Sequence, residues 1–271
     1  MQPESNTRPH VTVPSLRAMK QRGEKIAVVT AYDASFAAAA ETAGIDVVLV
    51  GDSLGMVVQG NDSTLPVTVD QIVYHTAAAA RGLDRTLLIA DMPFLSARDV
   101  PTALATARRL MGEGGAAMVK IEGSGWASGV IRALSERDVP VCAHLGLTPQ
   151  SVHKLGGFRV QGREDAAAAH LRAAAREVQD AGADLLVLEC VPSPLAAEIT
   201  RDLSIPTIGI GAGVDCDGQV LVMYDLIGLS RGRRPRFVRN FLAGTDSIVG
   251  ALSAYADAVR TRVFPGAEHS Y

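Results

Sequence analysis

Short apolar runs alternate with alanine-rich stretches along nearly the whole chain. Most of these runs are continuously apolar, which is typical of strands buried on both faces of a parallel sheet. Several alanine-rich stretches end at a glycine followed by an apolar residue, as at Gly44-Ile45 and Gly182-Ala183, and this pattern indicates a helix end leading into a strand. The pattern predicts strands at residues 25–31, 46–50, 86–91, 116–121, 140–144, 184–189, 205–210 and, most weakly, 219–223, with helices at 35–43, 70–81, 99–112, 126–137, 164–181 and 194–203.

This alternation predicts an α/β fold of seven or eight βα units. A closed (β/α)8 barrel is the favoured arrangement, and an open doubly wound sheet is the alternative. An extra helix at residues 14–23 is expected to close the barrel floor, and an amphipathic helix at residues 245–263 is expected to end the fold. No segment has the composition of a linker, and 271 residues suit one barrel, so a single domain over residues 1–271 is expected.

The composition narrows the function mainly by exclusion. The chain is 48% hydrophobic with a net charge of −3, so it lacks the basic surplus of a nucleic-acid binder. Residues 1–10 are polar, and no apolar stretch approaches the ~20 residues that cross a bilayer, so neither a secretory signal nor a membrane partner is expected. Cys142, Cys190 and Cys216 are widely separated, which predicts reduced thiols in a cytoplasmic protein.

Carboxylates follow four of the predicted strands at their carboxyl ends: Asp52, Asp91, Glu122 and Glu189. In a barrel these ends open onto one face, where essentially all barrel active sites lie, so the four acids are expected to converge. The alternative for Asp52 and Asp91 is an ordinary helix N-cap. Neither residue is followed at once by a helical pattern, which favours the active-site interpretation.

Two further ionisable residues belong to the same predicted face. Lys120 stands two residues before Glu122, so both side chains point to one side of the strand. They form either an internal ion pair or part of a substrate site, because buried lysine and glutamate rarely occur unpaired. His144 ends the fifth strand, where it is either a satisfied core histidine or a catalytic group.

These residue types predict a particular chemistry. Three carboxylates without histidine or cysteine ligands suit a hard cation, magnesium first, with coordination sites left for water or a chelating substrate. Lys120 can hold a substrate carboxylate as a point charge, and Glu189 can act as a general base. Together they favour removal of a proton beside a carbonyl, with the metal stabilising the enolate oxygen.

Two other motifs receive a structural interpretation. The glycine-rich stretch at residues 209–213 lacks the spacing of a dinucleotide fingerprint, so a tight turn after the seventh strand is expected rather than a phosphate loop. The basic cluster at residues 231–236 is expected to be a solvated or subunit-facing surface rather than a binding site.

A series of distinctive motifs runs in order from about residue 15 to the end of the chain. They are TAYD (30–33), VGDSLGM (50–56), TLPVT (64–68), ADMPF (90–94), VKIEG (119–123), HLGLTPQS (144–151), GGFRVQGR (156–163), LECVP (188–192), IGIGAG (208–213) and FPGAEHS (264–270). Together these motifs resemble the ketopantoate hydroxymethyltransferase family. The resemblance implies a TIM barrel of the phosphoenolpyruvate/pyruvate superfamily. It also implies one-carbon transfer from methylenetetrahydrofolate to 3-methyl-2-oxobutanoate, giving 2-dehydropantoate in pantothenate and coenzyme A biosynthesis.

The resemblance also implies roles for individual residues and a homo-oligomer, commonly a decamer of two rings. Glu189 matches the proton acceptor, and His144 matches a histidine near the substrate. Mg²⁺ would be the metal and methylenetetrahydrofolate the co-substrate. The implied metal site is Asp52, Asp91 and Glu122, and the implied keto acid site is Asp52, Ser53, Asp91, Lys120 and His144.

Two competing functions remain in view. A carbon–carbon lyase or mutase of the same superfamily would use the same magnesium-enolate chemistry, but those enzymes commonly have a Lys-Lys-Cys-Gly-His loop. Here the nearest string is Val141-Cys-Ala-His144, without the lysines. A barrel reused as a binding protein should have lost at least one acid or the lysine, and none is lost.

Overall fold

The eight strands close into one parallel barrel in sequence order in the computed structural model, which describes residues 9–230 and 234–271. β1 (Ile26–Thr30) pairs with β2 (Val47–Val50) on one side and with β8 (Gly218–Leu221) on the other. The second pairing closes the barrel, so the open-sheet alternative is wrong. The remaining strands are β3 (Leu87–Asp91), β4 (Met118–Glu122), β5 (Val141–Gly146), β6 (Leu185–Glu189) and β7 (Thr207–Ile210).

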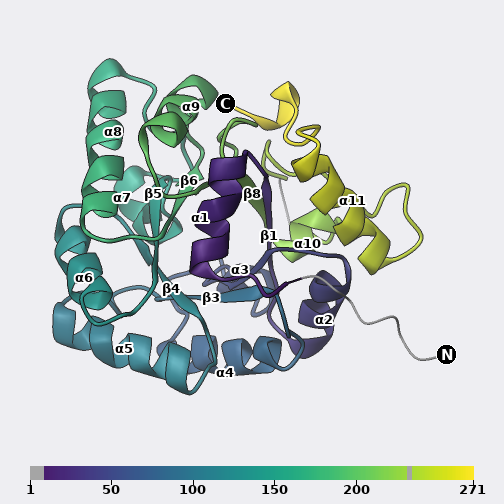
Figure 1. Cartoon of the computed structure of the whole chain (residues 1–271), viewed down its shortest axis with the longest axis horizontal. Helices are drawn as coiled ribbons and strands as arrows, with labels where there is room; N and C mark the ends of the chain where they lie inside the picture. The colour runs from purple at the N-terminus through teal and green to yellow at the C-terminus, as the bar shows by residue number, and fades with distance from the viewer. Residues whose placement is uncertain (1–8, 231–233) are drawn as a thin grey trace.

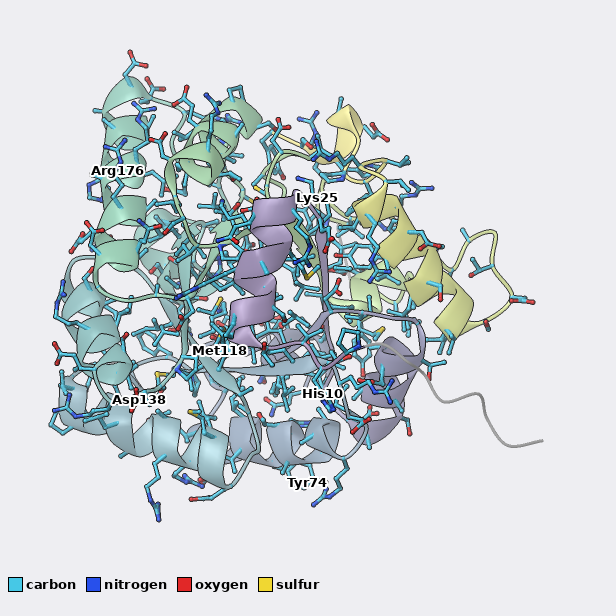
Figure 2. The ribbon with its side chains drawn as sticks, viewed as in Figure 1. His10, Lys25, Tyr74, Met118, Asp138 and Arg176 are labelled. Carbon is cyan, nitrogen blue, oxygen red and sulfur yellow. The ribbon has the colours of Figure 1, made fainter. Side chains whose placement is uncertain are left out.

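The strands are buried almost throughout, as their continuous apolar sequences predict. Six are buried along their whole length, and in β5 and β6 only the final residues, Gly146 and Glu189, are partly exposed. Figure 2 shows side chains filling the space between strands and helices, with Met118 near the centre and Tyr74 at the outer edge. Glu189 is thus a strand residue whose side chain reaches the opening.

The predicted helices surround the barrel (Figure 1) and are confirmed to within a few residues. Aspartate side chains cap the amino ends of two of these helices. Asp33 accepts a hydrogen bond from Phe36 N at 2.9 Å, and Asp99 accepts one from Thr102 N at 2.8 Å. The helices are α2 (Ala34–Thr42), α4 (Val69–Ala80), α5 (Val100–Gly112), α6 (Trp126–Ser135), α8 (Asp165–Asp180), α9 (Ser193–Asp202) and α11 (Ile248–Arg260).

The extra N-terminal helix, α1 (Val13–Arg22), lies across the barrel in Figure 1. Its Lys20 ammonium donates to the Asp217 carboxylate and to Thr200 O, each at 2.7 Å, and Arg17 pairs with Asp184. Asp184 and Asp217 immediately precede β6 and β8. The helix therefore covers the amino end of the barrel, as predicted, and leaves the carboxyl end open.

Several one-turn elements were not predicted, because four residues cannot display a helical apolar period. Three of them follow β2, β5 and β8 directly and so belong to the loops at the carboxyl end. None of the described helices is both long and apolar enough to span a membrane. The single-domain extent of residues 1–271 stays a prediction. The short elements are α3 (Leu54–Val57), η1 (Pro149–Ser151), α7 (Val152–Leu155), α10 (Met223–Leu226) and η2 (Ala267–His269).

Candidate active site

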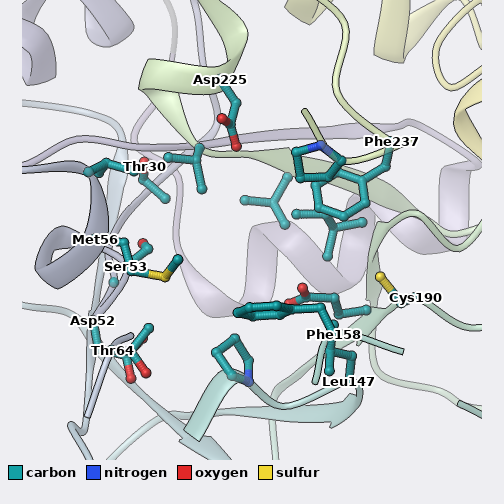
Figure 3. A pocket seen from close by; sticks show the side chains of 18 of the residues that line it. Thr30, Asp52, Ser53, Met56, Thr64, Leu147, Phe158, Cys190, Asp225 and Phe237 are labelled. Carbon is teal, nitrogen blue, oxygen red and sulfur yellow. The ribbon is translucent and has the colours of Figure 1, made fainter. Parts of the chain in front are cut away.

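A cavity of about 1300 Å³ opens at the carboxyl end of the barrel. It is lined by residues at the ends of the strands and in the loops that follow them. Phe158 and Phe237 reach into it from the side opposite Asp52 and Ser53 (Figure 3). Every residue that the sequence assigned to the site lines this one cavity: Asp52, Ser53, Asp91, Lys120, Glu122, His144 and Glu189.

The register of the sheet brings these residues together. Asp91 of β3 is the partner of Lys120 in β4, and Glu122 of β4 is the partner of His144 in β5. Glu189 of β6 is the partner of Gly146, two residues beyond His144. Neighbouring strands are ~4.8 Å apart, so side chains at matched positions on the inner face come into contact. The predicted convergence of the four acids is confirmed.

Three of the acids form a compact cluster. Asp52, Asp91 and Glu122 each offer a carboxylate oxygen within 4.8 Å of the others, and all three residues are buried. The Lys120 ammonium lies 2.8 Å from both oxygens of Asp91 and 3.5 Å from Glu122. The ion pair inferred between Lys120 and Glu122 therefore exists, although the cross-strand partner Asp91 is closer.

The N-cap alternative for the two aspartates is wrong. Ser53, not Asp52, precedes α3, and no side chain caps that helix. The Asp52 carboxylate instead accepts a 2.8 Å hydrogen bond from the Gln150 amide, and the Asp91 carboxylate accepts from Asp52 N at 3.2 Å as well as from Lys120. Both carboxylates therefore point into the cluster rather than toward a helix end.

The four groups of the cluster differ in how well their charges are compensated. Burial raises the pKa of Asp52 well above its usual range, and the neighbouring Asp91 and Glu122 add to this. Burial also raises the pKa of Asp91 against the opposing effect of Lys120. Burial lowers the pKa of Lys120, but Asp91 and Glu122 more than reverse this, so the ammonium stays charged. Asp52 is the least compensated acid.

The cluster fits a divalent metal ion. Three carboxylates and one ammonium leave two negative charges in a buried space, and a divalent cation would balance them. Oxygen ligands without thiols or imidazoles suit magnesium and related hard cations. Asp52, Asp91 and Glu122 are thus a suitable ligand set by both charge and chemistry.

His144 lies between two carboxylates. Its Nδ1 is 3.3 Å from Glu122 Oε1, and its Nε2 is 3.3 Å from Glu189 Oε2. Both contacts fall outside hydrogen-bond geometry, so they are charge contacts of a buried ring with the buried Glu122 and the partly exposed Glu189. Burial lowers the pKa of His144, yet Glu122 and Glu189 together raise it to about 9. A histidine satisfied by ordinary core hydrogen bonds is therefore excluded, and the ring links the metal-type cluster to Glu189.

Gln150 is a site residue that the sequence did not single out. Its side-chain amide donates to Asp52 and to Met92 O at 2.8 and 3.0 Å, and its backbone N–H donates to Glu122 at 3.0 Å. It therefore fixes two of the three acids from the loop after β5. The only sequence signal was its place in the TPQS string, because a neutral amide has no distinctive acid–base or metal chemistry.

Ser53 stands beside the cluster on the loop after β2. Its hydroxyl lies 2.9 Å from the Tyr32 hydroxyl, and either oxygen can donate. Burial raises the pKa of Tyr32 well above its usual range, so the phenol stays neutral and keeps its proton for such a bond. Ser53 thus presents a polar, uncharged edge to the cavity next to the charged acids, with the buried Tyr32 behind it.

The two remaining motifs are the glycine-rich stretch at residues 209–213 and the basic cluster at residues 231–236. The glycine-rich stretch forms the expected turn after β7, with Gly211 and Gly213 at φ of 62° and 88°. Residues 231–233 of the basic cluster lie outside the described residues. Arg234 and Arg236 are exposed, as expected of a surface, but both line the cavity. Their exposure agrees with the expected solvated surface, and whether they bind a ligand stays a prediction.

Known proteins of similar sequence agree with one another. The family model described as ketopantoate hydroxymethyltransferase matches residues 10–267. A 3-methyl-2-oxobutanoate hydroxymethyltransferase from Marinobacter nauticus is 58% identical, over 96% of this chain and 98% of that protein. The 3-methyl-2-oxobutanoate hydroxymethyltransferase 1 of Burkholderia cenocepacia is 57% identical, over 99% of this chain and 98% of that protein.

Solved structures show a likeness in fold. The crystal structure of 2,3-dimethylmalate lyase, a member of the PEP mutase/isocitrate lyase superfamily, has a TM-score of 0.57 over 79% of this chain and 81% of that one. The sequences are 22% identical, so the likeness concerns the barrel architecture and not the reaction.

Proposed function

Because the chain belongs to the ketopantoate hydroxymethyltransferase family, we propose that the residues at the mouth of its barrel perform the family's reaction. The protein transfers a hydroxymethyl group to 3-methyl-2-oxobutanoate in pantothenate synthesis. The observation that supports this use of the site is the buried cluster of three carboxylates with Lys120 at its edge. Similarity over nearly the full length favours the transferase over a lyase or mutase of the same barrel superfamily.

In this proposal Asp52, Asp91 and Glu122 hold Mg²⁺. When bound, the ion supplies a Lewis acid that polarises the carbonyl oxygen of the keto acid. Gln150 keeps Asp52 and Glu122 in place through its amide and backbone N–H. Lys120 keeps Asp91 ionised, because its ammonium contacts both carboxylate oxygens.

The keto acid is proposed to lie over this cluster. Its carboxylate is attracted by the Lys120 ammonium, the nearest buried positive charge beside the acids. Ser53, with its hydroxyl next to that of Tyr32, offers a hydrogen bond to an oxygen of the substrate. Asp52 and Asp91 would contact the keto acid from the side of the metal site, and His144 would contact it from β5.

Glu189 is proposed as the general base that takes the proton from C3 of the keto acid. It stands at the exposed end of β6, and its carboxylate is 3.3 Å from His144 Nε2. A positively charged His144 would hold this carboxylate in position at the cavity. The positioned base is expected to contribute ~10²–10⁴-fold to the rate.

The finer features of the reaction belong to the same proposal. Methylenetetrahydrofolate is the one-carbon donor, and it occupies the part of the cavity that the small keto acid leaves free. The protein works as a homo-oligomer, a decamer by its family resemblance, in the cytoplasm.

The decisive experiment is a transfer assay with 3-methyl-2-oxobutanoate, methylenetetrahydrofolate and Mg²⁺. Formation of 2-dehydropantoate is expected with the metal, and chelation with EDTA should abolish it until Mg²⁺ is restored. A control with oxaloacetate-type acids tests for lyase activity. Cleavage of those acids without any folate-dependent product would overturn the proposal.

A further inference from the structure

The cavity is larger than a five-carbon keto acid requires. Its volume of about 1300 Å³ exceeds the ~300–1,000 Å³ typical of sites for drug-sized ligands. The acid cluster, Lys120, His144 and Glu189 are contributed by the strand ends. Part of the remaining lining belongs to the loop between α7 and α8 and to described residues after α10, at a distance in the chain from the acids. A second reactant could bind against this part of the lining.

Four arginines characterise this second wall, which we name the arginine wall: Arg159, Arg163, Arg234 and Arg236. All four are exposed, and among the described residues none has a carboxylate within ion-pair distance. Arginines on the outer helices differ, because Arg172 pairs with Glu198 at 3.0 Å and Arg176 pairs with Asp202 at 2.7 Å. None of the four guanidinium groups is therefore committed to an ion pair among the described residues, so the wall has positive charge with which to attract an anion.

Other contacts of the wall show how it is arranged. Arg236 donates from Nε to Glu268 O at 3.0 Å, and its guanidinium lies 5.5 Å from the centre of the Tyr271 ring. This fixes Arg236 without neutralising its charge. Asp225 is the acid of this region, and it is already engaged by the Ser230 hydroxyl.

An exposed aromatic ring lies beside the wall. Phe158 directly precedes Arg159 and is 58% exposed, yet its side chain points into the cavity rather than away from the protein (Figure 3). A large apolar ring left open inside the cavity is a ready surface for stacking by a flat ligand. The wall therefore combines a flat apolar contact with several free positive charges.

We propose that the arginine wall binds the carboxylates of an extended anionic tail on the folate donor, while Phe158 contacts its flat ring system. The donor best suited to the site is then a folate with several γ-linked glutamates rather than one. This inference rests on the proposed function, because it assigns the donor of that reaction to a wall. Arginine suits the role, since its planar fork matches a carboxylate in two parallel hydrogen bonds.

Electrostatics supports the assignment. The protein has a net charge of −3, and four acids lie at the strand ends, so an anionic donor is repelled from most of the cavity. The arginine wall is the part of the lining where positive charges outnumber negative ones. It would draw the tail to one side and leave the reactive end of the donor facing the keto acid.

The test compares methylenetetrahydrofolates with one, three and five glutamates in the transfer assay. In the wild type, KM for the donor should fall as the tail lengthens, and 0.5 M NaCl should shrink this advantage through screening. Arg159→Gln with Arg163→Gln, and separately Arg234→Gln, should raise KM for the five-glutamate donor ~2- to 5-fold per arginine. KM for the keto acid and for the one-glutamate donor should move less.

Arg108→Gln is the matched control, since Arg108 is equally exposed but lies on α5 outside the cavity. Circular dichroism of each variant establishes that the fold is intact. Equal KM values for the three donors in the wild type, or the same tail-length ratio in the variants as in the wild type, would overturn the inference. No folate-dependent product with any donor would instead show that the proposed function itself is wrong.

Discussion

The Lys120 ammonium lies 2.8 Å from both carboxylate oxygens of Asp91, one strand away in the barrel. The pair is almost fully buried, with 5% and 2% of the two side chains exposed. A buried pair of this kind is costly to break, because removing one partner leaves the other charge without compensation. The same lysine thus contributes to the stability of the site and, in the proposed mechanism, would also attract the keto acid.

Replacing Lys120 by methionine should reveal both roles. We expect a loss of about 3–5 kcal/mol in the free energy of unfolding, together with weaker keto acid binding and slower turnover. Urea unfolding and titration calorimetry measure the two effects separately. Lys25→Met is the control, because Lys25 is also buried but donates to main-chain carbonyls at residues 214–216. Loss of stability with normal keto acid binding in Lys120→Met would remove this residue from the substrate site.

Asp52→Asn should weaken the binding of Mg²⁺ and should stabilise the metal-free protein. It should weaken Mg²⁺ binding by at least ~10-fold in calorimetry, because an amide replaces an anionic ligand. Asp225→Asn, which changes another acid in the cavity outside the cluster, should leave Mg²⁺ affinity unchanged. Unaltered affinity in Asp52→Asn would defeat the assignment of this ligand.

In the absence of metal, the wild type should be less stable than Asp52→Asn. The pKa of Asp52 is raised in the folded state, so its ionised form costs stability at pH 7. Asp52→Asn in EDTA should therefore be more stable than the wild type, by roughly 1–2 kcal/mol or about 2–8 °C in Tm. The difference should shrink as the pH falls through the raised pKa of Asp52, because the folded wild type then takes up a proton, and it should vanish in the ordinary carboxyl range, where the unfolded chain is protonated too. A less stable variant at pH 7 would contradict the charge imbalance inferred for the cluster.

Glu189→Gln should isolate the proton-abstraction step. With keto acid and Mg²⁺ but no folate, the wild type should exchange the C3 hydrogen of the substrate with D₂O. The variant keeps the shape of the side chain but cannot accept the proton, so exchange should slow by ~10²–10⁴-fold while keto acid binding persists. Proton NMR of the isopropyl signals follows the exchange. The exposed Glu198→Gln serves as control, and wild-type exchange in Glu189→Gln would make His144 the candidate base.

The three thiols should resist modification in the native protein. All are free and buried, and burial raises the pKa of Cys142 to about 12 and that of Cys216 to about 11. At pH 8 their thiolate fractions, and hence their rates with DTNB, should lie about two orders of magnitude or more below those in urea. Cys190 lines the cavity and should react first. Rapid labelling of two or more native thiols would contradict the burial described for them.

The barrel and its helices were predictable because buried parallel strands are continuously apolar. This pattern identifies a strand even when its predicted ends are wrong by one or two residues. The fourth strand was expected at residues 116–121 but spans Met118–Glu122. The shift includes Glu122, whose charge is accommodated by Lys120 and His144. The sequence pattern ended the strand at residue 121 because Glu122 is charged. A charged residue in a buried strand is explained only by its tertiary partners, which the sequence does not show.

The sequence predicted which residues belong to the site better than it predicted which residues contact one another there. Residues at the ends of strands share one face of a barrel, so their convergence follows from topology. The partner of Lys120 does not, because Asp91 is its neighbour only through the register between β3 and β4. The role of Gln150 was not predictable for a similar reason, since this residue of η1 meets Asp52 only through the tertiary structure.

The register of the sheet has an evolutionary consequence. Asp91, Lys120, Glu122 and His144 are held by the ladders between β3, β4 and β5, and Glu189 is held by that between β5 and β6. The arginine wall is instead held by loops, which tolerate insertion and replacement far better than ladders do. If the wall selects the donor as proposed, the reaction and the choice of donor can change independently. A laboratory graft that replaces the loop between α7 and α8 should then alter the choice of donor while retaining the reaction.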